Sequence, residues 1–413
     1  MASWKKKKVQ ILVLQREDGV LLIDQKEIHQ AFINHFKALF HCDAPLPTLT
    51  RSYPGAFPTH FDLLSVFSCK LSETHQNLLN LPFNEAEIKT AVFQMGKLKA
   101  PGPDGFIAGF YQNYWSIVGP SIVETVLAFL QLGYLLKEFN KPFICLILKI
   151  KDPMTVNDFR PISLCNVIYK IGSKVLANRL REVLPHLIAP NQSAFLQGRI
   201  ISDNILIAHK LIEFIRHTKK GRKIFFGLKL DMNKAYDQVN WEFLLFVFRC
   251  MDFSDHWVKL IHQCVSTVSF SVLLNGHPSE FFTPKARLRQ GDPLSPYLFI
   301  LVMQALSKGL THFAQQGEKL WCLQWLLNAF CEQSGLRINI SKSELYISPN
   351  FGGRERGILD SIFSFKVVPN PGIYLGASLH YSGRTKREVF NILVEKVSRK
   401  LQGWKCRLLT FCW

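Results

Sequence analysis

The apolar residues of the chain recur at two different spacings, which predict a mixture of helices and strands. A spacing of four marks a helix through Ile28, Phe32, Phe36 and Phe40. The same periodicity predicts further helices near residues 84–95, 110–115, 168–181 and 323–330. Lysines and arginines stand between the apolar positions of 168–181, so we expect that helix to have a basic outer face.

Short apolar runs bounded by turn-forming residues predict strands. A strand pair turned at Glu17-Asp-Gly begins the chain, and Asn275-Gly276 between two apolar runs is typical of a tight β-hairpin. We expect further extended segments at 143–150, 158–164, 224–230 and 336–340, and one that begins at 374. The strand at 224–230 ends directly before Asp231.

Three further stretches have patterns of their own. Residues 42–69 are rich in proline and turn formers, which indicates a linker or extended arm. Residues 389–413 alternate basic and apolar positions at helical spacing. Residues 97–105 form a basic loop with several Gly and Pro residues; it lacks the Gly-Lys-Ser/Thr ending of a phosphate-binding P-loop, so local physics predicts only a helix-capping turn.

Composition indicates a folded chain with a polyanionic partner. With 413 residues and 48% hydrophobic content, the chain can bury a large core and divide into two or three lobes. Fifty Lys and Arg against 31 Asp and Glu give a net charge of +19, distributed along the whole length. Such an excess favours nucleic acid over a simple gain in solubility.

The cysteines and the hydrophobic runs argue against a secreted, a zinc-binding and a membrane-spanning protein. The chain has 10 cysteines but no signal peptide at its start, so we expect reduced thiols, and no spacing predicts a zinc site. The longest apolar run, 294–306, is too short to span a bilayer. We therefore expect an intracellular protein of the nucleus or cytoplasm that is neither secreted nor bound to a membrane.

Asp231 is the first candidate for chemistry. Nucleotidyl transfer needs carboxylates that hold two Mg²⁺ ions against a triphosphate and a primer hydroxyl. An aspartate at a strand end in a basic chain suits one such ligand. On local sequence alone, Asp231 could equally be the N-cap of a following helix.

From about Ile11 to its end, the chain resembles the reverse transcriptase of LINE-type (non-long-terminal-repeat) retrotransposons, of the kind abundant in plant genomes. Seven motifs stand in the family order: Lys-Ala-Pro-Gly-Pro-Asp-Gly, Asp-Phe-Arg-Pro-Ile-Ser-Leu, Asn-Gln-Ser-Ala-Phe-Leu-Gln-Gly-Arg, Gly-Leu-Lys-Leu-Asp-Met-Asn-Lys-Ala-Tyr-Asp-Gln-Val, Arg-Gln-Gly-Asp-Pro-Leu-Ser-Pro, Ser-Gly-Leu-Arg-Ile-Asn and Tyr-Leu-Gly. The resemblance implies an α+β, right-hand polymerase fold with fingers, palm and a partial thumb, its palm an antiparallel sheet backed by helices.

The resemblance also implies regions and partners. We expect an N-terminal extension and linker at 1–83, fingers at 84–222, palm at 223–348, and the palm end with a partial thumb at 349–413. RNA template, DNA primer, deoxynucleoside triphosphate and Mg²⁺ would be the ligands. Because no endonuclease or ribonuclease H region accompanies these motifs, we expect a fragment of a polyprotein.

The resemblance assigns roles to residues near the nucleotide. Asp231 would bind metal, and Tyr236 would exclude a 2′-hydroxyl by bulk unless it is only a core aromatic. Lys149 and Arg160 would hold phosphates, for which the planar fork of arginine is suited.

Further residues would contact the base pair or the nucleic acid. Gln290 and Gly291 would lie against the nascent base pair, where glycine permits close approach of the backbone. Four basic residues would contact nucleic acid, namely Lys97, Lys99, Arg199 and Arg289. Asp237 is expected to be structural, and Leu148 replaces a proline that is more usual in the family.

The main departure from the family follows Leu306. The Ala-Asp-Asp hairpin that completes the metal site is missing, because no Asp occurs between Asp292 and Asp360 and no Asp-Asp pair occurs anywhere. The residues Phe313-Ala-Gln-Gln316 resemble the lost turn, but neutral amides cannot supply the charge that Mg²⁺ needs. A deletion in the element, or a wrongly predicted splice, explains the loss.

Two functional hypotheses follow. The first is a degenerate RNA-directed DNA polymerase with absent or badly impaired activity. The second is a non-catalytic nucleic-acid-binding remnant that keeps the basic groove. Extension of a primer would separate both hypotheses from an intact enzyme.

Overall fold

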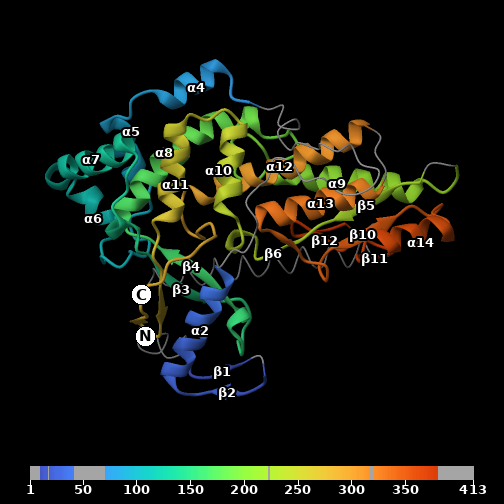
Figure 1. The fold of residues 1–413 in the computed structure, drawn as a ribbon, viewed down its shortest axis with the longest axis horizontal. Helices are drawn as coiled ribbons and strands as arrows, with labels where there is room; N and C mark the ends of the chain where they lie inside the picture. The colour runs from blue at the N-terminus through green and yellow to red at the C-terminus, as the bar shows by residue number, and fades with distance from the viewer. Residues whose placement is uncertain (1–9, 17, 41–69, 222–223, 317–319, 380–413) are drawn as a thin grey trace, which may run out of the picture. The chain divides into compact units, whose positions relative to one another are not determined.

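The computed structural model describes residues 10–16, 18–40, 70–221, 224–316 and 320–379. Helices and strands are mixed along the chain, which confirms the predicted α+β class (Figure 1). The chain forms two compact units. The first unit comprises 1–190, 195–197 and 232–337, and the second comprises 191–194, 198–231 and 338–413. The predictions for 42–69 and 389–413 lie outside the described residues.

A four-stranded sheet with the order β4-β3-β7-β8 lies in the first unit. Its strands are β3 (Phe143–Leu148), β4 (Phe159–Leu164), β7 (Ser271–Leu274) and β8 (His277–Pro278). β3 pairs antiparallel with β4 and parallel with β7, and β7 pairs antiparallel with β8. Asn275 and Gly276 both have positive φ, of 51° and 91°, which confirms the predicted hairpin turn.

Helix α2 (Gln25–Leu39) packs on this sheet. Asp24 caps its N-terminus by accepting from the Lys26 backbone N–H. Ile28, Phe32 and Phe36 on its apolar face are buried against the sheet, as their spacing predicts. The short pair β1 (Leu14–Gln15) and β2 (Leu21–Leu22) precedes α2 and is antiparallel, as predicted.

The first unit contains a group of helices whose longest member is α8. They are α4 (Glu73–Asn80), α5 (Glu85–Phe93), α6 (Ala108–Asn113), α7 (Trp115–Leu132), the 3₁₀ turn η1 (Lys137–Asn140) and α8 (Val167–Leu187). The capping box of Asn84 and Glu87 starts α5 where the sequence predicts a helix. The predicted 110–115 helix is instead two helices that meet at Tyr114.

The predicted basic outer face of α8 is wrong at Arg179. Only 7% of Arg179 is exposed, and its guanidinium forms a two-pronged ion pair with Glu87 at 2.7 and 2.9 Å. It also donates to the backbone oxygens of Leu79, Leu81 and Pro82. The arginine is buried because it satisfies carbonyls that the end of α4 leaves without helical partners.

Helix α7 is the one described helix that is long and apolar enough to cross a membrane by length and composition. Its 18 residues have a mean hydropathy of 1.4, and 28% of them are buried. Length and composition alone are weak grounds for a membrane span, since the core helices of soluble proteins share them.

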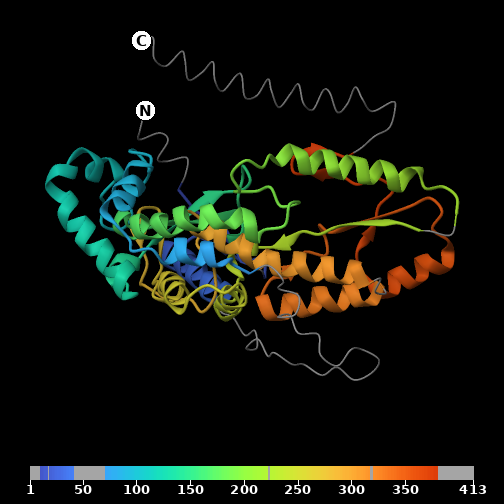
Figure 2. The ribbon, with the colours of Figure 1, turned by 90° about the horizontal axis from the view of Figure 1, so that it is seen from above.

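The first unit contains further helices, among them the orange pair α12 and α13, which lie side by side in Figure 2. It contains η2 (Val156–Asp158), η3 (Ala235–Asp237), α10 (Trp241–Cys250), α11 (Asp255–Ser266), α12 (Ser295–Gln316) and α13 (Leu320–Ser334). α12 packs against α13, and only residues 317–319 separate them in the sequence. The Phe313–Gln316 segment therefore ends a helix, and the described residues of this span contain no strand pair.

The second unit contains a three-stranded sheet with the order β11-β10-β5. Its elements are α9 (Ile201–His217), β5 (Phe226–Lys229), β10 (Glu344–Ile347), α14 (Gly353–Ile362), β11 (Lys366–Val367), β12 (Ile373–Tyr374) and β13 (Ala377–Ser378). β5 and β10 are antiparallel but β10 and β11 are parallel, so this sheet is mixed. β6 (Met232–Asn233) and β9 (Arg337–Ile338) lie where the chain passes between units.

Candidate polymerase site

Asp231 follows β5, the edge strand of the described sheet in the second unit. Its backbone is fixed on both sides, because its N–H donates to Ser343 Oγ at 3.1 Å and its C=O accepts from Asn339 N–H at 2.7 Å. The residue is half-buried. A strand end thus presents Asp231, as the sequence predicts.

The donor set around Asp231 does not fit a two-metal centre. Among the described residues, no group of three or more His, Cys, Asp or Glu side chains is placed to hold a metal ion. Glu344 is the nearest acid in the strand register, opposite Lys229, but it forms an ion pair with Lys229 at 2.9 Å. Two divalent ions need several carboxylates, and the described residues place Asp231 in no such group.

Lys149 and Arg160 lie on neighbouring strands of the first unit. Lys149 directly follows β3, and its N–H donates to the Asp158 carbonyl at 2.8 Å. Arg160 lies opposite Ile147 in the β3–β4 pairing, and both cations are exposed. The structure therefore brings these two together. Because Asp231 belongs to the other unit, its convergence with them stays a prediction.

Leu148 occupies the position where proline is more usual. It continues β3 in register with Phe159, and its side chain packs against the core under α2. The strand pairing therefore extends through this position.

Tyr236 is half-buried in the turn η3. Its ring stacks on Phe299 of α12, with 4.9 Å between centroids and 20° between planes. Its carbonyl accepts from Leu288 N–H at 2.7 Å, and burial raises the pKa of its phenol. The ring is thus held by a neighbour but is not enclosed, which leaves its predicted role in sugar selection open.

Gln290 and Gly291 form a loop that lies on β4. The Ser163 N–H donates to the Gln290 carbonyl at 2.8 Å. Gly291 has φ of 111°, and a Cβ at this position would stand 2.9 Å from the Ser163 carbonyl oxygen. The glycine is therefore needed for close approach to the protein's own strand. The Gln290 side chain is exposed.

The four residues predicted to contact nucleic acid are distributed over both units. Lys97 and Lys99 are exposed between α5 and α6 of the first unit. Arg199 belongs to the second unit and donates to the Gln192 carbonyl at 2.7 Å.

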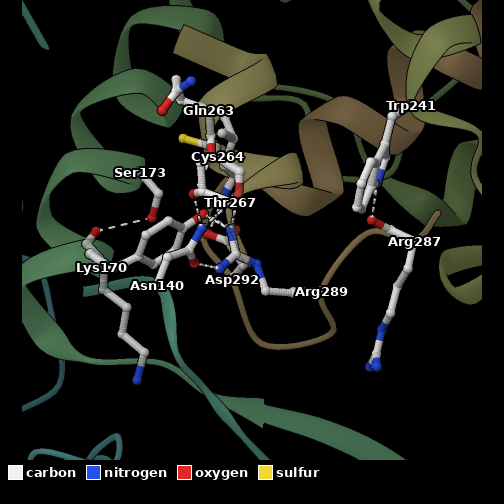
Figure 3. Close-up of polar contacts among 12 residues, drawn as sticks. Asn140, Lys170, Ser173, Trp241, Gln263, Cys264, Thr267, Arg287, Arg289 and Asp292 are labelled. Carbon is white, nitrogen blue, oxygen red and sulfur yellow. Dashed lines mark hydrogen bonds and ion pairs between the residues drawn. The ribbon is translucent and has the colours of Figure 1, made fainter. Parts of the chain in front are cut away.

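Arg289 lies in the interior of the first unit, only 4% exposed (Figure 3). Its guanidinium donates to Asn140 Oδ1, to the Tyr169 hydroxyl and to the Cys264 carbonyl. One of its nitrogens is 3.3 Å from Asp292 Oδ2. This placement does not fit direct contact with nucleic acid, and internal partners account for the charge.

Tyr169 and Asp292 complete this buried network. The Tyr169 hydroxyl donates to Asp292 Oδ2 at 2.7 Å, and burial raises the pKa of the phenol well above its usual value. Asp292 Oδ1 accepts from the Leu294 N–H at 3.2 Å, just before α12 begins. The network therefore fixes both ends of the loop that carries Gln290 and Gly291.

Arg287 forms a second buried ion pair. Its guanidinium lies over the rings of Phe40 and Phe270, at 4.0 and 4.8 Å from their centroids, and its Nε is 3.3 Å from Asp237 Oδ1. This nitrogen forms no hydrogen bond with a described residue. Burial lowers the pKa of Arg287 to about 10 and raises that of Asp237. The Trp241 indole donates to the Arg287 carbonyl at 2.8 Å.

Sequence reasoning did not find these two networks. Arg287, Leu288 and Arg289 are 2%, 1% and 4% exposed. Consecutive buried residues outside a helix or strand show no periodic pattern from which their burial could be predicted. The partners Tyr169 and Asn140 lie 120 and 149 positions from Arg289 in the sequence. Periodicity cannot detect pairs at such separations.

Comparison with known proteins agrees with this geometry. Residues 149–379 match the family described as reverse transcriptase (RNA-dependent DNA polymerase). An uncharacterized 149 kDa protein of transposon TX1 from Xenopus laevis is 29% identical over 423 residues, which cover 96% of this chain and 31% of that protein.

Two relatives from Drosophila melanogaster match about half of the chain. The Pol polyprotein of the type-2 retrotransposable element R2DM is 29% identical over 51% of this chain and 19% of its own length. The RNA-directed DNA polymerase from mobile element jockey is 24% identical over 52% of this chain and 23% of its own length. The chain spans less than a third of each of these three relatives.

Proposed function

The chain belongs to the reverse transcriptase (RNA-dependent DNA polymerase) family, and we propose that it is the polymerase domain of a LINE-type, non-long-terminal-repeat retrotransposon. Its relatives in transposon TX1, R2DM and jockey support this type of element, and the motif resemblance favours the kind found in plants. Its ligands would be RNA template, DNA primer and deoxynucleoside triphosphate, in the nucleus or cytoplasm.

We further propose that the domain binds these ligands but extends a primer poorly or not at all. The observation that carries this proposal is an incomplete carboxylate set beside otherwise complete motifs. Asp231 stands at its strand end, yet no Asp occurs between Asp292 and Asp360. Helices α12 and α13 follow each other where the family has its Ala-Asp-Asp hairpin. One carboxylate cannot hold two divalent ions in line with the attacking and leaving oxygens.

Binding depends on a different property, the distributed positive charge. Lys97, Lys99, Lys149 and Arg160 are all exposed on the first unit. Each phosphate contact releases counterions, so affinity for nucleic acid should fall steeply as salt rises. Loss of the metal ligands would leave this electrostatic contribution intact.

The experiment is fluorescence anisotropy of a labelled RNA–DNA primer–template titrated with recombinant protein at several KCl concentrations. We expect log Kd to rise linearly with log salt. The Lys97→Gln/Lys99→Gln variant should have a shallower slope, by roughly two, while Lys26→Gln on α2 serves as an exposed control. Affinity that does not depend on salt would contradict the proposed nucleic-acid surface.

The origin of the lost hairpin can be tested separately by sequencing. Genomic DNA between the codons for Thr311 and Gln324 should contain no in-frame Ala-Asp-Asp codons if the element itself carries the deletion. In-frame codons for that motif would place the defect in the splice prediction, and the gene would encode a complete site.

A further inference from the structure

The strand β5 (Phe226–Lys229) has one edge without a neighbouring strand among the described residues. In the sheet of the second unit, with the order β11-β10-β5, it stands last and pairs with β10 alone (Figure 1). All four of its residues are half-buried. The edge of a sheet presents a row of unpaired N–H and C=O groups, which another chain can pair with.

The register with β10 shows which main-chain groups of β5 point to this edge. The Ser348 N–H donates to the Phe225 carbonyl at 2.9 Å, so the groups of Phe225 point toward β10. Along an antiparallel strand this direction alternates from one residue to the next, and the groups of Leu228 therefore point away. The opposite residue agrees, because the Leu345 carbonyl turns from β5 and accepts from the Val368 N–H at 2.9 Å.

The features that usually protect an edge strand are missing from β5. Natural edges are often blocked by proline, by charged side chains or by extreme shortness. Residues 224–230 contain no proline and a single charge, on Lys229, and that ammonium is paired with Glu344 at 2.9 Å. The other outer strand, β11, has only two residues. β5 is therefore the edge of this sheet that is suited to pair with another strand.

Apolar side chains of α9 lie beside the same strand. The helix packs on β5, where a Cβ on Gly227 would stand 3.3 Å from the Ile215 side chain. The Phe214 ring contacts that of Phe225, with 4.9 Å between centroids, yet Phe214 is 54% exposed. Leu211, about one turn before Ile215 on the same side of the helix, is 56% exposed. Association with another molecule would cover such apolar surface.

We propose that β5, together with Leu211 and Phe214 of α9, forms a surface that binds a second copy of the chain. We call this surface the open edge. Two identical strands in antiparallel pairing supply each other with donors and acceptors, and two-fold symmetry closes the assembly at two copies. With the axis at Leu228, the N–H of this residue in each copy donates to its carbonyl in the other. Both copies of α9 then lie on one face of the joined sheet.

The chemistry of β5 favours a second copy over nucleic acid. Phosphate groups are bound by free cations, and the ammonium of Lys229 is already neutralised by Glu344. A strand of the same sequence, in contrast, offers matching apolar side chains and main-chain groups. The inference goes beyond the proposed function and does not depend on it.

The net charge of +19 makes the association sensitive to salt. Two such chains repel each other at low ionic strength, and salt screens this repulsion. Apolar contacts and main-chain hydrogen bonds at the open edge are not weakened in the same way. The dimer should therefore become more stable as salt rises, whereas binding of nucleic acid should become weaker.

Two variants test the open edge, and a third is the matched control. Leu228→Pro removes an N–H that points away from β10, and proline is tolerated at such edge positions. Leu211→Lys places a positive charge beside the edge in each copy. Leu206→Lys is the control, because Leu206 is a 60% exposed leucine of the same helix. It lies about two and a half turns from Ile215 and so faces away from β5.

The experiment is sedimentation velocity of the full chain without nucleic acid, over a range of protein and KCl concentrations. Thermal unfolding of each variant confirms that it folds. We expect the wild type and Leu206→Lys to form a dimer whose Kd falls as KCl rises. Leu228→Pro should raise this Kd by at least about tenfold, because each copy loses a hydrogen bond. Leu211→Lys should raise it as well.

A wild-type chain that stays monomeric at every protein and salt concentration would overturn the inference. A dimer that Leu228→Pro and Leu211→Lys both retain with the wild-type Kd would also overturn it, since another surface would then hold the two copies. If Leu228→Pro does not fold, the comparison of Leu211→Lys with Leu206→Lys decides. Binding of a primer–template is measured separately. Its absence would contradict the proposed function and leave the dimer in place.

Discussion

The Arg289 guanidinium contacts η1, α8 and α11 from within the first unit, and the carboxylate of Asp292 faces it. Removing a guanidinium from water costs several kcal/mol, which only a full set of partners can offset. The Tyr169 ring adds a cation–π contact at 4.0 Å. Such a buried arginine holds the framework of the Gln290–Gly291 loop.

The first prediction concerns this network. Arg289→Ala should lower the free energy of unfolding by about 3–5 kcal/mol, because it leaves the buried carboxylate of Asp292 without its cation. Urea unfolding followed by circular dichroism measures the change. Arg249→Ala on α10 removes an exposed arginine and should stay within about 0.5 kcal/mol of wild type. Equal midpoints for the two variants would refute the assigned role.

The second prediction concerns how the free energy of unfolding changes at acidic pH. The folded-state pKa of His35 is lowered to about 4 by burial, Lys234 and Lys149. Its value in the unfolded chain is about 6.5, so as pH falls between these values the unfolded chain takes up the proton first. Unfolding free energy should therefore decrease from pH 6.5 to 4, by on the order of 1 kcal/mol after solvent screening is allowed for.

His35→Gln removes this titration and should flatten the decrease in the same pH range. The comparison is made by urea unfolding at several pH values. His277→Gln on β8, an exposed histidine, is the control and should keep the wild-type slope. A His35→Gln variant that follows wild type at every pH would show that His35 does not titrate in this way.

At the scale of elements, the loop before α12 is held directly against the strand β4. Ser163 on β4 donates to the Gln290 carbonyl, and Gly291 lies too close to the Ser163 carbonyl for any side chain. The position of Gln290 is thereby set by the strand that also carries Arg160. Two motifs far apart in sequence are thus coupled through backbone contacts.

The third prediction tests this coupling. Gly291→Ala should destabilise the protein by roughly 1–3 kcal/mol, because φ of 111° is strained for alanine and its Cβ would meet the Ser163 carbonyl at 2.9 Å. Gly357→Ala in α14 is the matched control, since apart from its chain neighbours and the backbone of its own helix no described atom lies within 4 Å of its Cβ position. Alanine inside a helix should instead stabilise, by about 1 kcal/mol. Equal unfolding temperatures of the two variants would contradict the coupling.

Elements with local signals could be predicted from the sequence. The i, i+4 phenylalanines of α2 and the Asn275-Gly276 turn specify their structure over a few residues, and both are confirmed. The capping box at Asn84 marks the start of α5 in the same way. These signals are local because hydrogen bonds and apolar spacing within a single turn decide them.

Features that depend on distant partners could not be predicted. Arg179 is buried because carbonyls about 100 positions away need donors, and basic residues on an amphipathic helix otherwise favour solvent. The parallel pairing of β11 with β10 made the second sheet mixed, although the family resemblance implied an antiparallel one. Interior networks such as that of Arg289 arise from tertiary packing, which periodicity does not record.

At the scale of the whole molecule, charge and carboxylates separate binding from chemistry. A net charge of +19 distributed over the chain favours contact with nucleic acid wherever lysine and arginine side chains are exposed. Catalysis by two metal ions depends instead on a few acids in one place, and the described residues contain no such group. This separation is the reason for our proposal that the chain binds nucleic acid but does not extend a primer.

The measurement that tests this account most directly is template-dependent primer extension in Mg²⁺ or Mn²⁺, by the wild-type chain and by Asp231→Ala. We predict that both proteins bind the primer–template and that neither extends it, since the loss of metal ligands costs several orders of magnitude in rate. Dideoxy-sensitive extension by the wild type that Asp231→Ala abolishes would contradict the account, and would show that another acid, such as Glu332 or Glu344, replaces the missing carboxylates.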